Sequence, residues 1–123
     1  MIGNEKGNFG ENIACAYLEK NGYVILERNY HSRYGEIDII ASKGDYIAFV
    51  EVKLRKKNSR VSAKESVSFS KQKKIVLTSV LYLQEKNVDF QHRYDVVAVT
   101  PCSDDEFSIE HIKAAFDTQN IFY

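Results

Sequence analysis

The sequence predicts a three-layer α/β fold with a mixed central sheet, because its elements follow the order α-β-β-β-α-β with one further strand at the end. Two of the early strands form a hairpin, whereas the second helix lies where a crossover between strands is expected. The chain has 123 residues, of which 44% are hydrophobic and 28% charged. These values are ordinary for a globular protein, so we expect residues 1–123 to form a single domain.

The first element is a helix, expected from a cap at Asn8 to about Lys20, with Gly22 as its stop. Residues 1–7 are expected to form an irregular leader. Residues 23–30 then favour a strand, rich in apolar and β-branched side chains. The apolar face of the helix is expected to consist of Phe9, Ile13, Ala14, Tyr17 and Leu18.

The next two strands, residues 35–41 and 47–53, are predicted to pair as a hairpin around Gly44 and Asp45, a glycine-first two-residue turn. With that turn, one face of the hairpin is wholly apolar, as a core face should be. A slip of one residue would move every side chain to the other face, so this pattern supports the register. The apolar face consists of Ile37, Ile39 and Ala41 opposite Val52, Val50 and Ala48.

The other face of the hairpin is charged at its open end, where the register places Asp38 opposite Glu51 and Glu36 opposite Lys53. Two carboxylates in directly opposite positions repel each other unless a cation lies between them or one is protonated. Carboxylate oxygens suit Mg2+, which commonly takes one or two of them and keeps several waters. An ammonium beside such a pair can hold an attacking water or stabilise charge on a phosphate. The pattern therefore indicates phosphodiester hydrolysis.

A basic segment follows the hairpin. From Lys53 to Lys74 the sequence has nine Lys or Arg and a single acid, Glu65, although the whole chain has a net charge of zero. Such a local asymmetry can attract a polyanion even when the net charge does not. We expect the first part to be a surface loop that contacts phosphates.

The remaining elements are a helix over residues 68–86, a buried strand over 93–100 that ends at Pro101, and a last strand over 107–112. The helix is expected to bury Ile75, Val76, Leu77, Val80, Leu81 and Leu83. The segment from Lys113 is expected to begin a short helix. His111 is expected at the surface.

Two cysteines without disulfide or metal-ligand spacing, and no apolar run long enough to span a membrane, indicate a cytoplasmic protein.

The spacing of Asp38, twelve intervening residues and Glu51-Val52-Lys53 resembles the D…ExK signature of the PD-(D/E)xK nuclease superfamily, which has the restriction-endonuclease-like fold and includes archaeal Holliday-junction resolvases. A longer ordered set is similar to the small bacterial YraN family and runs from about Gly7 to about Val99. It consists of Gly10-Glu11, Gly22-Tyr23, Arg28-Asn29, Gly35-Glu36-Ile37-Asp38, Phe49-Val50-Glu51-Val52-Lys53, Arg55, Lys71 and Arg93-Tyr94-Asp95.

The resemblance implies an endonuclease that depends on Mg2+ or Mn2+ and acts on DNA, including branched or flapped forms. Asp38, Glu51 and the carbonyl of Val52 would hold the metal, and Lys53 would orient the water. Glu11 is either a further carboxylate of this site or a first-turn acid favoured by the helix dipole. Glu36 would tune Lys53 or join the carboxylates. The residues expected to contact nucleic acid are Arg28, Arg55, Lys56, Lys57, Arg60, Lys71 and Lys74.

Two other interpretations stay open. One is a nucleic-acid-binding module of nuclease-like fold with little or no cleavage, because fold does not establish catalysis. The other is an interaction protein in which Glu36 and Lys53 form a cross-strand ion pair and Asp38 is protonated. By analogy with resolvases, which cut two strands symmetrically, we favour a homodimer.

Overall fold

The computed structural model describes residues 5–87 and 90–119. The predicted order of elements is confirmed, with a fifth strand at the end. The elements are α1 (Glu5–Lys20), β1 (Val24–Ser32), β2 (Gly35–Lys43), β3 (Tyr46–Leu54), α2 (Phe69–Lys86), β4 (Gln91–Ser103) and β5 (Glu106–Phe116).

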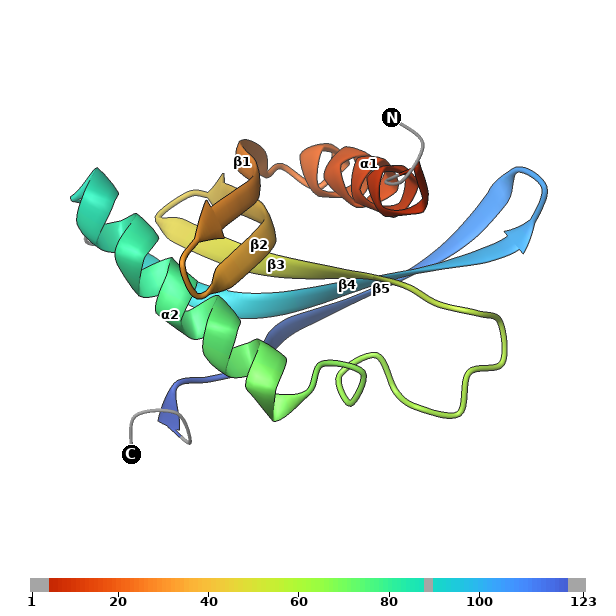
Figure 1. Ribbon diagram of the computed structural model, residues 1–123. Coiled ribbons are helices and arrows are strands. Elements are labelled where there is room, and N and C mark those ends of the chain that lie inside the picture. The colour runs from red at the N-terminus through yellow and green to blue at the C-terminus, as the bar shows by residue number, and fades with distance from the viewer. Residues whose placement is uncertain (1–4, 88–89, 120–123) are drawn as a thin grey trace.

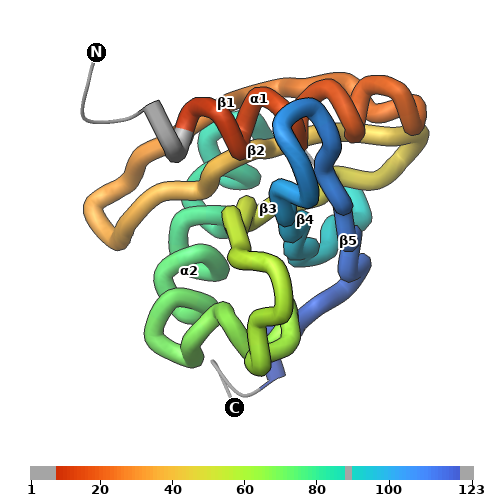
Figure 2. Tube along the Cα trace, turned by 90° about the vertical axis from the view of Figure 1, so that its right-hand side faces the viewer, coloured from red at the N-terminus to blue at the C-terminus, as the bar shows by residue number. Residues whose placement is uncertain are grey.

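The five strands form one sheet in the order β1-β2-β3-β4-β5. β3 and β4 are parallel, and α2 provides the crossover between them, whereas the other neighbouring pairs are antiparallel. The predicted mixed sheet is therefore confirmed. The helices lie on opposite faces of this sheet, which gives three layers (Figures 1 and 2).

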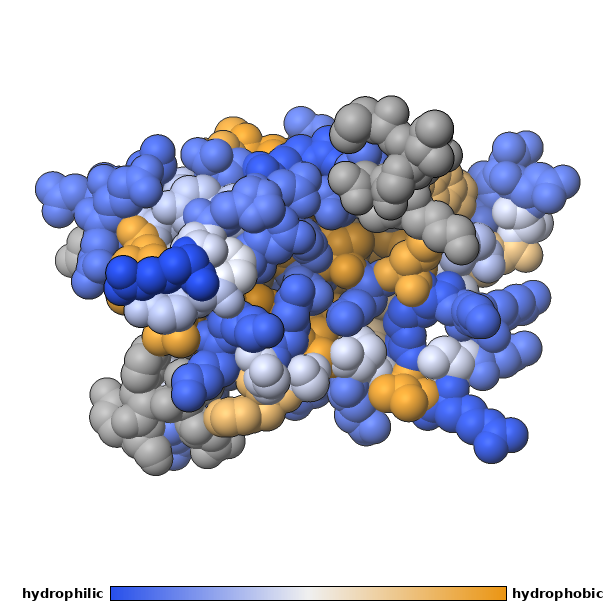
Figure 3. Space-filling model, in the orientation of Figure 1, coloured by the Kyte–Doolittle hydropathy of each residue, from blue (hydrophilic) through white to orange (hydrophobic). Residues whose placement is uncertain are grey.

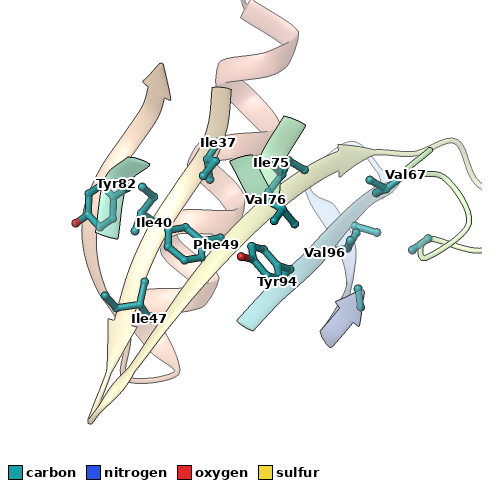
Figure 4. Close-up of a cluster of buried hydrophobic side chains, with 13 residues drawn as sticks. Ile37, Ile40, Ile47, Phe49, Val67, Ile75, Val76, Tyr82, Tyr94 and Val96 are labelled. Atoms are coloured by element: carbon teal, nitrogen blue, oxygen red, sulfur yellow. The ribbon is translucent and has the colours of Figure 1, made fainter. Parts of the chain in front are cut away.

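Each face of the sheet has its own hydrophobic core. On the α1 side, Ala14 and Leu18 are fully buried against Ile39, Val50 and Val97. On the α2 side, the buried residues include Ile37, Ile40, Phe49, Ile75, Val76, Tyr82, Tyr94 and Val96 (Figure 4).

The ends of the two helices correct two expectations. α1 begins at Glu5 rather than at Asn8, so residues 5–7 are helical and only residues 1–4 of the expected leader lie outside the description. Glu5 and Lys6 are good helix formers, which allows the helix to start before the predicted cap. Gly22 ends the helix as predicted, with a left-handed φ of 91°.

The buried stripe of α2 also includes polar positions, namely Thr78 and Ser79. The Ser79 hydroxyl lies 2.7 Å from both the Val76 carbonyl and the Tyr94 hydroxyl, so it is buried without an unsatisfied group. Leu77, Val80, Leu81 and Leu83, predicted as buried, are half-buried, whereas Ile75 and Val76 are buried as predicted.

The hairpin register is confirmed near the turn and wrong at the open end. β2 and β3 pair from Lys43 with Tyr46 to Ile39 with Val50, and no further pairs follow. Asp38 is thus not paired with Glu51, nor Glu36 with Lys53.

The reason lies partly in β1. Asn29 lies opposite Asp38, between the pairs of Arg28 with Ile39 and Tyr30 with Ile37, and it has a left-handed φ of 53°. This conformation interrupts the regular strand geometry. Beyond it Ile37 packs on the α2 side with Ile40, not on the face of Ile39 as predicted.

The C-terminal strands are longer than expected. β4 continues through Pro101 instead of ending there. The pairing of β4 with β3 stops at Leu54 and Val99, so β3 does not need a hydrogen bond from the N–H that Pro101 lacks. β5 continues to Phe116 in place of the expected helix from Lys113.

Within residues 5–87 and 90–119, neither helix combines the length and the apolar character that crossing a bilayer requires.

Candidate active site

The two carboxylates predicted to form the site lie where β2 and β3 separate. Asp38 Oδ2 accepts a hydrogen bond from the backbone N–H of Val52 at 2.8 Å. This side chain therefore takes over a backbone donor just beyond the last ladder pair. Asp38 and Glu51 are both buried, with exposed fractions of 9% and 4%.

Glu51 is flanked by two ammonium groups from different elements. Its Oε2 lies 3.7 Å from Lys53 Nζ on the same strand and 3.8 Å from Lys71 Nζ on α2. Its other oxygen, Oε1, is buried and has no hydrogen-bond partner among the described residues. A buried, unpartnered carboxylate oxygen is costly, so this atom points to a group that the protein alone does not supply.

The electrostatics of Glu51 agree with that inference. Burial and the neighbouring Asp38 carboxylate raise the pKa of Glu51 to about 8, although Lys71 and Lys53 oppose the increase. Near neutral pH this carboxyl group therefore keeps a proton that a bound cation would displace.

A third carboxylate, Glu11 on α1, is also buried beside this pair. Burial and the Asp38 carboxylate raise the pKa of Glu11. Its Oε1 accepts a hydrogen bond from Asn29 Nδ2 at 3.1 Å and lies 3.6 Å from Arg28 Nη2. Glu11, Asn29 and Arg28 thus form one contact set next to Asp38.

The basic segment forms a surface beside these carboxylates. Lys53, Arg55, Lys56 and Lys57 line a cavity of about 410 Å3. Arg55 to Lys57 also line a second cavity of about 450 Å3, with Arg60 and the outer half of the β4–β5 hairpin. Figure 3 shows hydrophilic side chains at the lower right of the molecule, where Figure 1 places the β3–α2 connection.

Comparison with known proteins assigns the chain to a family. The family model described as "Uncharacterised protein family UPF0102" matches residues 10–99. The chain belongs to the UPF0102 family. The resemblance to the YraN family, another name for this group, is thereby confirmed.

Curated relatives carry the same family name. A "UPF0102 protein" of Clostridium tetani (strain Massachusetts / E88) is 48% identical over 112 residues, which cover 89% of this chain and 92% of that protein. Similar proteins come from Rhodococcus opacus (strain B4), at 42% identity with 89% and 94% covered, and from Desulforapulum autotrophicum, at 45% with 91% and 93% covered. The UPF0102 match spans every predicted site residue, from Glu11 to Lys74.

In this UPF0102 protein, two predicted residues lie apart from the carboxylate pair. Glu36 Oε2 lies 3.3 Å from His31 Nε2, so its contact is with the exposed end of β1 and not with Lys53. Without the Glu36–Lys53 ion pair, the interaction-protein interpretation lacks its main contact. Lys74 is exposed on α2 and packs beside Gly35.

Three residues have contacts that the sequence could not specify. Lys71 was predicted to contact phosphate, yet it also forms an ion pair with Glu51, twenty positions away in the chain. Arg28 was expected to contact nucleic acid, yet both it and the adjacent Asn29 contact Glu11. Only folding brings α1, β1 and α2 to the same point.

The side chains fit a Mg2+ ion of low protein coordination. Within the described ranges, no group of three or more His, Cys, Asp or Glu is arranged to hold a metal. Mg2+ does not require such a cage, because it is commonly bound by one or two carboxylates and several waters. The unpartnered Oε1 of Glu51 and the adjacent Asp38 carboxylate supply ligands of the right type.

Proposed function

We propose that this UPF0102 protein is a Mg2+- or Mn2+-dependent endonuclease that hydrolyses phosphodiester bonds in DNA, with branched or flapped DNA as the preferred class. The observation that carries the proposal is Glu51: a buried carboxylate with an unpartnered oxygen, beside Asp38 and between two lysines.

Asp38 and Glu51 would hold the ion, with the Val52 carbonyl as a further ligand. A bound divalent cation would lower the pKa of a water and neutralise charge on the phosphate. The Val52 N–H fixes the Asp38 carboxylate, so its orientation does not depend on the ligand. Glu11, held by Asn29, adds negative potential next to Asp38.

Lys53 is the residue proposed to position the attacking water or to stabilise charge on the phosphate. Its Nζ is already within 3.7 Å of Glu51 and its side chain is 31% exposed, so it is both positioned and accessible. Lys71 supplies a second positive charge from the first turn of α2, where the helix dipole also favours an anion.

The basic surface supports a polyanionic substrate. The two cavities beyond Lys53 extend the positive charge from the carboxylates along the β3–α2 connection to Arg60. Lys and Arg contacts to successive phosphates give affinity without reading sequence. We propose that DNA follows this surface, and that the protein acts as a homodimer in the cytoplasm, where DNA and Mg2+ are both present.

The test is cleavage of linear, flapped and four-way DNA in Mg2+ or Mn2+, with EDTA as the metal-free control. Asp38→Asn and Lys53→Ala are expected to abolish the products. Asp45→Asn in the exposed hairpin turn and Lys20→Ala at the end of α1 are the matched controls and should cleave like the native protein. Cleavage that persists in Asp38→Asn would indicate a contaminating nuclease and would contradict the proposal.

The second candidate is a DNA-binding module without cleavage. It is favoured by the two lysines that already contact the Glu51 carboxyl group without any metal. Salt-sensitive DNA binding without products, retained in both site variants, would establish this function instead.

A further inference from the structure

A third basic cavity lies at the other end of the sheet. It has a volume of about 340 Å3 and is lined by Tyr23, Lys43, Gly44, Tyr46, Arg93 and Lys113. Tyr23 directly precedes β1, and the other residues come from the β2–β3 turn and its flanks, the start of β4 and the end of β5, on the side of Figure 1 away from the basic loop. Lys43 is five residues along β2 from Asp38, which corresponds to roughly 17 Å. This cavity is therefore separate from the candidate active site.

One buried carboxylate organises the cavity. Asp95 is fully buried, and its two oxygens accept hydrogen bonds from Arg93 Nε at 2.9 and 3.1 Å. The same carboxylate lies 2.8 Å from His111 Nε2. Arg93 also donates from Nη2 to the Tyr23 hydroxyl. The guanidinium is held on two sides, while its remaining N–H groups are available to the cavity.

Asp95 also fixes β5, the strand that carries Lys113, which is the second positively charged residue of the cavity. Its Oδ1 accepts a hydrogen bond from the backbone N–H of Ala114 at 3.1 Å. Ala114 has a left-handed φ of 52°, and the pairing of β4 with β5 shifts at this place. This irregularity within β5 places the adjacent Lys113 at the cavity.

The third positively charged residue, Lys43, lies over the ring of Tyr23. Lys43 Nζ is 5.3 Å from the centre of the Tyr23 ring, and the Arg93 guanidinium is 5.5 Å from the centre of the Tyr46 ring. Asp95 balances the charge of Arg93, whereas none of the described residues that line the cavity is acidic. Three positive groups and two tyrosines thus line the same space.

We propose that this cavity is a phosphate-binding site, in which Lys43, Lys113 and Arg93 contact the anion and Tyr46 borders it. Arg with its fixed donors and lysines as mobile charges are the residues that recognise phosphate. The phosphate is either one of a nucleic-acid backbone or that of a free nucleotide. The site does not depend on metal or on cleavage.

The test is a titration with inorganic pyrophosphate, followed by the 15N-NMR signals of Lys43, Gly44 and Lys113 and by the Arg93 side-chain signal. In the native protein these signals should shift together and saturate. In Lys43→Ala/Lys113→Ala, which leaves Arg93 and its buried partners intact, affinity should fall about tenfold or more. Lys20→Ala/Lys86→Ala carries the same charge change outside the cavity and should bind like the native protein.

A second arm identifies the source of the phosphate. Binding of labelled duplex DNA is measured by fluorescence anisotropy in EDTA over a range of salt concentrations. If the ligand is the DNA backbone, the cavity variant should bind more weakly, and its salt-dependence slope should decrease by about 2. If DNA affinity is unchanged while pyrophosphate affinity is lost, the ligand is a free phosphate compound. Absence of saturable shifts, or equal losses in the control variant, would overturn the proposal.

Discussion

Replacing Glu51 with glutamine should remove a pH-dependent cost to folding. The pKa of this carboxyl group is raised from its ordinary value of 4.5 to about 8, chiefly by burial and by Asp38. Between these two values the folded protein keeps a proton that the unfolded chain releases. Stability therefore falls as the pH rises from about 4.5 to 8 and levels off above 8.

The magnitude follows from the shift. Each pKa unit corresponds to about 1.4 kcal/mol, so the native protein should lose about 4 kcal/mol more than Glu51→Gln between pH 5 and pH 9. Glu51 is only 4% exposed, so solvent screening reduces this value little. Glutamine has nearly the same shape and no charge, and it leaves Asp38 as the only member of the pair that ionises.

The assay is urea unfolding of both proteins in EDTA at intervals from pH 5 to pH 9, with the difference in free energy of unfolding plotted against pH. Titrating groups outside the Glu51–Asp38 pair cancel to first order in that difference. A difference that stays flat across the range would refute the proposed environment of Glu51. Repeating the series with Mg2+ extends the test: above pH 8 the ion should stabilise the native protein, by about 2.7 kcal/mol at a concentration of 100 Kd, and Glu51→Gln much less.

Three other substitutions test the fold by the same unfolding assay. Asp95→Asn should cost about 3 kcal/mol, because it removes the charge of a fully buried carboxylate that holds the half-buried Arg93; a loss below 1 kcal/mol would show that this ion pair is dispensable. Gly22→Ala should cost about 1 kcal/mol, since φ is 91° there, whereas the same change at Gly10, inside α1 and with no Cβ contact under 3.8 Å, should not destabilise. Ser68→Ala should cost about 1 kcal/mol by removing the cap that accepts the Lys71 N–H, and an unchanged stability would mean that water replaces it.

The parts of the fold that could be predicted are those set by local patterns. The hairpin register near Gly44 follows from alternation and turn chemistry, and the five ladder pairs of β2 and β3 agree with it. Gly22 could be recognised as a helix stop because a left-handed residue is needed there. These signals lie within a few residues of the feature that they specify.

The parts that could not be predicted depend on distant partners. The alternation of the sequence predicts that His111 faces solvent, yet its side chain is only 4% exposed. Its Nε2 forms a hydrogen bond with Asp95 on the neighbouring strand, which holds the ring inside the protein. Asn29 adopts a left-handed conformation opposite Asp38 and donates to Glu11 eighteen residues earlier. Neither contact leaves a signal in the residues next to it.

The unpredicted end of the β2–β3 pairing also explains how the candidate site forms. Had the ladder continued, backbone carbonyls of β2 would have accepted the hydrogen bonds of the β3 N–H groups. No side chain would then have been required as an acceptor there. Because the strands separate beyond Ile39 and Val50, the Val52 N–H takes the Asp38 carboxylate as its acceptor and fixes it beside Glu51. Glu51 keeps an unpartnered oxygen in the same gap. The interruption of regular pairing thus holds the carboxylates in place before any ligand arrives, which is the arrangement that a metal site requires.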